Sequence, residues 1–246
     1  MSVKTYSKNI METGTVSLTA GTAHADFPLV RLFDRNISDL FKTTAAVTTE
    51  IRVDQGATGN IEINTCIIAA DHNLTGETLD IQHSPDGAAW TDATTQFAGT
   101  DGVIIKTLTG GTKRYWRLKV TSPSAAVEIP ELFFSPSYDW EADPSYPLET
   151  IEDQHNIQSI TDAAGSNYYL KKGDPKKIRK YNMQLILETQ KDNLLDLWAD
   201  WGGYKPFYIT DHDGTIFFTE IIGPLNLGGK IKGVYGAIMN LREVLV

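Results

Sequence analysis

The chain has 246 residues, of which 41% are hydrophobic and 22% charged, and its formal net charge is −9. This length allows one large domain or two of ordinary size, in a soluble globular protein by composition. Both halves, divided near residue 138, carry more acidic than basic side chains, which argues against a reader of duplex DNA. No apolar run approaches the roughly 20 residues that cross a bilayer, and residues 1–20 lack the basic start and apolar core of a signal peptide.

The first half of the chain predicts many short strands. Polar and apolar residues alternate over 50–54, 60–64, 78–82 and 115–120, and residues 127–134 complete the series despite Pro130. Turn signals such as Ser84-Pro85-Asp86-Gly87 and Gly110-Gly111 separate them. Without a convincing helix, this pattern predicts an antiparallel β-sandwich. The only cysteine, Cys66, lies in an apolar run, which predicts a buried and unreactive thiol.

Four motifs in the first half occur in the order typical of one known fold family. They are Leu32-Phe33-Asp34-Arg35-Asn36, Val53-Asp54-Gln55-Gly56, Ser84-Pro85-Asp86-Gly87-Ala88-Ala89-Trp90 and Arg114-Tyr115-Trp116-Arg117. Over about residues 25–135 the chain therefore resembles a galactose-binding-like, or discoidin-type, jelly roll. Members of that family bind sugars or lipids through variable loops, so the resemblance implies a fold more than a ligand. Trp90, Tyr115 and Trp116 could line a sugar-binding surface, but packing within the domain is the favoured interpretation of both tryptophans.

Residues 138–147 mix prolines, acids and aromatics and predict a linker between a first domain (1–137) and a second (148–246). In the second domain, residues 180–187, 205–209, 215–222 and 233–245 predict strands. Residues 190–201 predict one amphipathic helix, with Leu194, Leu197, Trp198 and Trp201 on its apolar side. The predicted fold class is mainly β: a jelly-roll sandwich followed by a smaller β-sandwich that carries one helix.

The helix is followed by Gly202-Gly203-Tyr204-Lys205-Pro206-Phe207, and the chain ends near Leu241-Arg242-Glu243-Val244. With these motifs, residues 145–246 resemble the minor tail protein M and distal tail proteins of long-tailed bacteriophages. The resemblance implies a structural virion protein in a homo-oligomeric ring, a hexamer in that family, at the end of the tail tube. Its partners would be the tail tube, the hub and other tail proteins, with the first domain contacting host-surface glycan or another tail protein. The residues expected at the subunit interface are Trp198, Trp201, Phe207, Tyr208, Phe217 and Phe218.

A basic run in the second half gives a candidate electrostatic contact, formed by Lys171, Lys172, Lys176, Lys177, Arg179 and Lys180. It could contact nucleic acid inside a tube or an acidic patch of a neighbouring subunit, but a solvated loop that leads into a strand is the simpler interpretation. Aromatic residues are not interleaved with these charges, which disfavours single-strand binding. No specific nucleic-acid binding is expected.

No catalytic motif, metal-ligand spacing or cofactor-binding loop stands out, so the sequence predicts a protein that is not an enzyme and holds no cofactor. Asp211-His212-Asp213-Gly214 could centre a metal-dependent hydrolase, but a hairpin turn is the favoured interpretation, since no further ligands occur at metal-site spacing. Asn73-Leu74-Thr75 matches a glycosylation acceptor by pattern alone. The main alternative to a tail protein is a carbohydrate-binding module of a bacterial surface or secreted protein.

Overall fold

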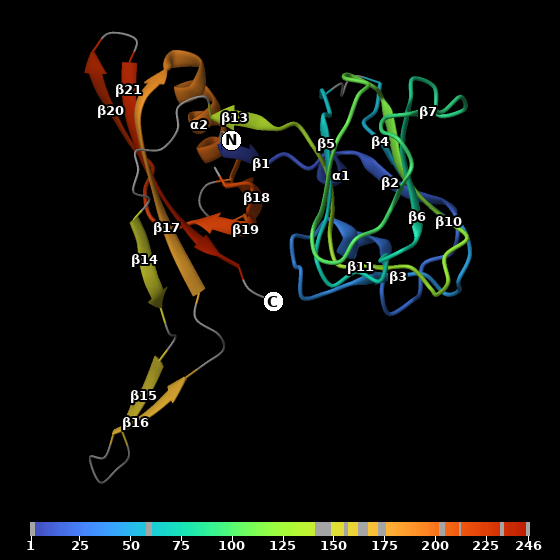
Figure 1. Ribbon diagram of the computed structural model, residues 1–246, viewed down its shortest axis with the longest axis horizontal. Helices are drawn as coiled ribbons and strands as arrows, with labels where there is room; N and C mark the ends of the chain where they lie inside the picture. Colours follow the sequence, from blue (N-terminus) through green and yellow to red (C-terminus); the bar gives the residue numbers. More distant parts are fainter. Residues whose placement is uncertain are drawn as a thin grey trace. The chain divides into compact units, whose positions relative to one another are not determined.

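The computed structural model describes residues 3–57, 61–140, 149–154, 157–161, 167–171, 176–201, 205–211, 213–231 and 234–244. It divides the chain into two compact units, and the first is Tyr6–Ser137, which we call the jelly-roll unit. The second, which we call the sheet unit, combines Met1–Thr5 with Tyr138–Val246. The mainly β class is confirmed (Figure 1). None of the helices in the described parts of the chain is long and apolar enough to cross a membrane.

The jelly-roll unit contains one α-helix, one 3-10 helix and strands β2 to β12. The helices are α1 (Ile10–Thr13) and η1 (Leu29–Leu32). The strands are β2 (Thr15–Ala20), β3 (Phe41–Lys42), β4 (Thr49–Asp54), β5 (Thr65–Ile68), β6 (Thr78–Ser84), β7 (Thr91–Asp92), β8 (Phe97–Ala98), β9 (Ile104–Thr107), β10 (Tyr115–Thr121), β11 (Glu128–Ile129) and β12 (Leu132–Ser135).

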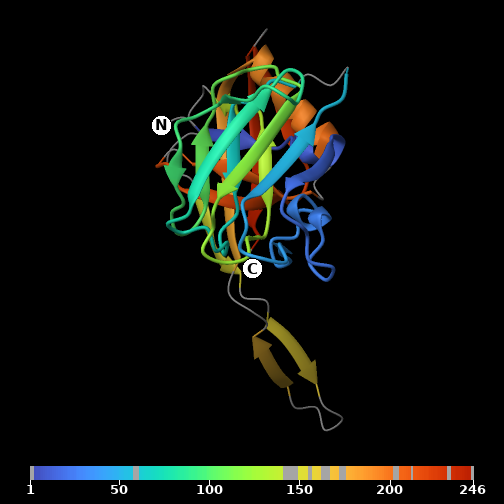
Figure 2. The ribbon, with the colours of Figure 1, turned by 90° about the vertical axis from the view of Figure 1, so that its right-hand side faces the viewer.

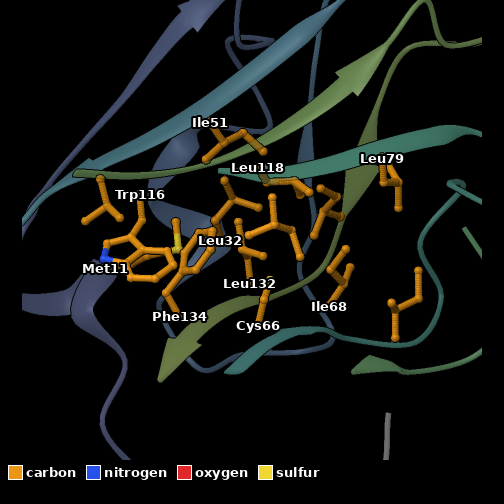
Figure 3. Packing of buried hydrophobic residues seen from close by; sticks show 14 of the residues in the cluster. Met11, Leu32, Ile51, Cys66, Ile68, Leu79, Trp116, Leu118, Leu132 and Phe134 are labelled. Carbon is orange, nitrogen blue, oxygen red and sulfur yellow. The ribbon is translucent and has the colours of Figure 1, made fainter. Parts of the chain in front are cut away.

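Two antiparallel sheets form the sandwich of this unit. One runs in the order β2-β4-β10-β6-β7, with β8 also paired to β6, and the other in the order β12-β5-β9 (Figure 2). The predicted inward face of β10 is confirmed, because Trp116, Leu118 and Val120 are fully buried in one apolar cluster. Figure 3 shows Trp116 beside Phe134 of the opposite sheet, with ring centroids 6.3 Å apart.

The strand predicted over residues 60–64 is wrong. Asn60 lies outside the described residues, and Glu62 forms only an isolated bridge with Thr112. The strand of this region is β5, whose four residues are all buried. A strand that is covered on both faces shows no polar alternation, so the period-two pattern favoured the wrong segment. Cys66 lies in β5 and burial raises the pKa of its thiol, as expected of an inert cysteine.

Among its described residues the sheet unit contains one long helix, α2 (Glu188–Trp201), which agrees with the predicted helix at 190–201. Its strands are β1 (Val3–Tyr6), β13 (Tyr138–Trp140), β14 (Glu149–Gln154), β15 (Ile157–Thr161), β16 (Asn167–Lys171), β17 (Lys176–Leu187), β18 (Phe207–Thr210), β19 (Ile216–Ile221), β20 (Asn226–Ile231) and β21 (Val234–Glu243).

One eight-stranded sheet organises this unit. Its order is β13-β1-β18-β19-β21-β17-β14, with β20 also paired to β21. Leu194 and Leu197 of α2 are buried in the same apolar cluster as Val3, Trp140 and residues of β18, β19 and β21. Strands β15 and β16 pair only with each other among the described residues and form a separate hairpin (Figure 1).

The start of the chain and the predicted linker differ from the sequence-based division. Residues 1–5 were placed with the first domain, but β1 pairs with β13 of the sheet unit, so that Val3 lies opposite Trp140. The predicted linker begins with β13, because Trp140 is 6% exposed and belongs to the core of the sheet unit. The remaining linker residues, 141–147, lie outside the described residues. Strand β20 was not predicted, because the paired glycines Gly228 and Gly229 indicate a loop.

We expect Val3→Ala to destabilise the sheet unit selectively. Val3 is fully buried, and removing its two methyl groups should lower the free energy of unfolding by about 2 kcal/mol. Hydrogen exchange should speed up in β18 and β21 and stay unchanged in β4 and β10. Val47→Ala is the control, since Val47 is 44% exposed. Equal loss of protection in both units would contradict the assignment of β1 to the sheet unit.

Candidate functional site

The six aromatic residues predicted at a subunit interface are mostly buried. Phe207 and Phe217 belong to the core of the sheet unit, which corrects the surface role predicted for them. The rings of Tyr208 and Phe218 lie 4.8 Å apart, and these residues are 2% and 6% exposed. Trp198 is partly exposed and packs against the core, and the side chain of Trp201 is outside the described residues.

The basic run is not simply a loop. Its Lys171 ends β16, and four of the first five residues of β17 are basic, namely Lys176, Lys177, Arg179 and Lys180. The position of Lys172 and the side chains of the other five lie outside the described residues. On β14, Glu149 lies opposite Lys180, so the neighbouring strand brings an acidic residue to this stretch.

The Asp211–Gly214 motif forms the turn between β18 and β19. The Asp211 N–H donates to the Thr215 carbonyl oxygen at 2.8 Å, and Gly214 takes φ +86°, a conformation that suits glycine. His212 lies outside the described residues. Within the described ranges, no group of His, Cys, Asp and Glu side chains could hold a metal ion. The side chain of Asn73, the acceptor residue of the glycosylation pattern, is held by two hydrogen bonds: its Nδ2–H donates to the Ala126 carbonyl, and its Oδ1 accepts from the Glu128 N–H.

Trp90 lies on the outer face of the six-stranded sheet, beneath an arginine. The Arg117 guanidinium carbon is 4.1 Å from the centroid of the Trp90 ring. Arg117 also donates to Gln82 Oε1 and to Glu50 Oε2, both at 2.8 Å. One face of the indole ring is therefore covered, and the polar groups around it satisfy one another. Trp116 is buried and offers no open ring face, whereas Trp90 is partly exposed with one ring face beneath Arg117.

A second aromatic site was not predicted from the sequence. It lies on residues 23–31, a segment that follows β2 and includes the first three residues of η1, and that we call the His24 loop. The Phe27 ring is partly exposed, with the His24 ring centroid 5.3 Å away and the Arg31 guanidinium carbon 5.5 Å from its centroid. Val30, in η1, is 52% exposed and adds an apolar edge. The Phe27 ring is thus grouped with the His24 imidazole and the Arg31 guanidinium, which are both planar and carry N–H donors.

Backbone hydrogen bonds hold the His24 loop in place. The His24 N–H donates to the Lys42 carbonyl at 2.8 Å, and the Lys42 N–H donates back to the Phe27 carbonyl at 3.3 Å. Lys42 belongs to β3, which pairs with β11. The Asp26 N–H donates to His24 Nδ1 at 3.2 Å, so a neutral His24 carries its proton on Nε2. The loop therefore presents its side chains in a preformed arrangement.

A buried charge cluster lies at the C-terminal end of this segment. Arg35 adopts φ +61°, its N–H donates to Glu131 Oε2 at 3.0 Å, and its guanidinium pairs with Glu12 and bonds the Ser7 carbonyl. Glu131 is fully buried, and its Oε1 has no hydrogen-bond partner among the described residues. These contacts fix the chain after η1 against Glu12 of α1, Ser7 before it, and Glu131 just before β12.

Glu131 is a neutral acid in the folded protein. Burial raises its pKa to about 9, and the nearby Asp34 carboxylate adds to this effect. The Arg35 guanidinium acts in the opposite direction but does not outweigh burial. Burial also raises the pKa of Asp34 and lowers that of Arg35. Because the Glu131 carboxyl group keeps its proton at neutral pH, the cluster carries fewer negative charges than it would if all of its carboxyl groups were ionised.

Comparison with solved structures finds carbohydrate-binding modules. Chitosan-binding module 1 from the chitosanase/glucanase of Paenibacillus sp. IK-5 is 21% identical, with a TM-score of 0.44, over 53% of this chain and 98% of that one. CpGH89CBM32-6 of Clostridium perfringens is 20% identical, with a TM-score of 0.42, over 54% and 100%. CpGH89CBM32-5 of the same organism, in complex with GalNAc-β-1,3-galactose, is 17% identical, with a TM-score of 0.41, over 50% and 94%. No family model and no curated protein matches the chain.

We expect Glu131→Gln to remove a pH dependence of stability. In the wild type, the unfolded chain releases the Glu131 proton near its ordinary value of 4.5, whereas the folded chain keeps it until about pH 9. The wild-type free energy of unfolding should therefore fall as pH rises between these values, by at most about 1.4 kcal/mol per pH unit from this group. Urea unfolding at pH 5 and pH 8 measures the slope.

Glu128→Gln is the matched control, because Glu128 is half-buried on β11 and pairs with Lys42 at the surface. It should keep the wild-type slope, while Glu131→Gln should gain stability relative to the wild type as pH rises. Parallel pH profiles for the wild type and Glu131→Gln would contradict the assignment of a neutral buried acid.

Proposed function

We propose that the jelly-roll unit binds a glycan through the His24 loop. The observation that carries this proposal is the partly exposed Phe27 ring, grouped with His24 and Arg31 on a segment pinned to β3. A sugar presents an apolar C–H face and a rim of hydroxyl groups. An aromatic ring can stack against the first, while imidazole and guanidinium N–H groups donate to the second.

The proposed activity is binding without catalysis. The preformed loop lowers the entropic cost of association, since the backbone is ordered before the ligand arrives. Cys66 is buried and its thiol pKa is raised, so it is not a nucleophile. Glycan binding of this kind fits both a tail protein that contacts host-surface glycan and a carbohydrate-binding module of a bacterial surface or secreted protein.

Phe27→Ala in the full chain should weaken glycan binding at least tenfold, about 1.4 kcal/mol, because it removes the stacking surface. A glycan array identifies the ligand, and calorimetry on wild type and variant then measures the loss. Phe97→Ala is the matched control, because Phe97 on β8 is also a partly exposed ring beneath a cation, with Lys106 Nζ 4.2 Å from its centroid. If Phe97→Ala abolished binding and Phe27→Ala did not, the site would lie beside β8 instead.

We also propose a structural role for the sheet unit, as the ring-forming part of a phage tail protein found in the virion. The β15–β16 hairpin favours it, since no other described strand pairs with this hairpin. An isolated two-stranded hairpin is at best marginally stable in water, so a neighbouring molecule would be needed to hold it. A ring of copies, six by the family resemblance, supplies such a neighbour at every interface.

The purified full chain should form a closed oligomer by mass photometry, and Ile160→Pro should dissociate it. Ile160 lies opposite Tyr168 within the hairpin, and proline cannot donate to a β ladder. Circular dichroism should show that the variant keeps its sheet content. A wild-type chain that stays monomeric at every concentration would contradict the ring and leave the carbohydrate-binding module of a surface or secreted protein.

A further inference from the structure

The outer face of the six-stranded sheet places two arginines directly opposite each other. Arg52 on β4 is the register partner of Arg117 on β10. Like charges at opposed positions of an antiparallel pair are destabilising. The chain as a whole carries a net charge of −9, so this pair is a local exception that calls for a compensating anion.

The neighbouring carboxylates compensate other arginines. Glu50 Oε2 lies 2.8 Å from Arg117 Nη1, and Asp54 holds Arg114 through two hydrogen bonds of 2.7 and 2.9 Å. The described contacts of Arg52 comprise only its stacking on Tyr115, with its guanidinium carbon 5.2 Å from the ring centroid. Its Nε–H is buried and has no acceptor among the described residues. Of these three arginines, Arg52 is the one that forms no ion pair among the described residues.

Aromatic rings hold this arrangement rigid. Arg52 and Arg114 stack on Tyr115, and Arg117 stacks on Trp90 at 4.1 Å. Ser17 on β2 lies opposite Arg52 on its other side and brings a hydroxyl group to the same row of the sheet. A guanidinium fork that is fixed in this way is preorganised for a planar oxyanion.

We propose that Arg52 is an oxyanion site, which takes the carboxylate or sulfate group of an acidic glycan on the outer face of the sheet. That the anion belongs to a glycan rests on the proposed glycan binding. That Arg52 binds an oxyanion rests on the contacts of Arg52 described above. The bound anion accepts hydrogen bonds from the Arg52 Nη groups, since its Nε–H is buried, and offsets the repulsion between Arg52 and Arg117. Binding involves no covalent step.

The site is tested first with simple probes on the full chain. The arginine Nε–H signals are followed by NMR while sodium sulfate or sodium glucuronate is added at constant ionic strength. We expect the Arg52 signal to shift with saturation, and the Arg114 signal to move much less because Asp54 already occupies its fork. Sulfate and glucuronate separate the two anion types, and the absence of a saturable Arg52 shift with either would overturn the proposal.

Variants then connect the site to glycans. Arg52→Gln should lower the affinity for a uronate or sulfated oligosaccharide about tenfold and leave the affinity for a neutral oligosaccharide unchanged. Arg114→Gln is the control, because it removes the same charge from the same face and should lower the affinity less. Thermal unfolding should show Arg52→Gln to be at least as stable as the wild type, since it removes the opposed charge. Equal losses for both variants would overturn the Arg52 site. Failure of every oligosaccharide to bind, with the Arg52 shift intact, would instead overturn the proposed glycan function.

Discussion

The alternation of side chains along β10 is the constraint on which both the core and the surface of the jelly-roll unit depend. Successive residues of a strand point to opposite faces, so one strand of seven residues serves two purposes. Trp116, Leu118 and Val120 fill the space between the sheets. Tyr115 and Arg117 face outward and, with Arg52, form the aromatic and cationic surface of the same sheet. A shift of one residue in register would exchange the two sets, and the burial of Trp116 prevents that shift.

The elements that the sequence predicts well are those whose pattern is local. Strands β4, β6 and β10 follow clear alternation, and α2 follows helical spacing. Strand β5 could not be found in this way, because both of its faces are covered and its neighbours in space come from distant segments. The N-terminal strand could not be assigned either, since four residues do not reveal which sheet they will join.

The candidate site depends on contacts that no local pattern contains. His24, Phe27 and Arg31 show no periodicity; the Phe27 N–H closes a local bond to the His24 carbonyl, and the bonds to Lys42 fix the loop to β3. Glu131 follows a proline and resembles an ordinary surface acid, yet it is buried beside Arg35, 96 residues away along the chain. That Arg52 forms no ion pair among the described residues is visible only when the partners of Arg114 and Arg117 are known. Each of these features depends on residues that come together only in the folded chain, and no local sequence pattern predicts such contacts.

The pairing of β1 with β13 has a consequence for the order of biosynthesis. These strands are the two points at which the chain passes between units, and they lie antiparallel as neighbours in one sheet. A ribosome makes β1 before the jelly-roll unit and must complete that whole unit before β13 and β18 emerge to receive β1. Strand β1 therefore waits without its sheet partners while the jelly-roll unit is made, and the eight-stranded sheet closes only after that unit is complete.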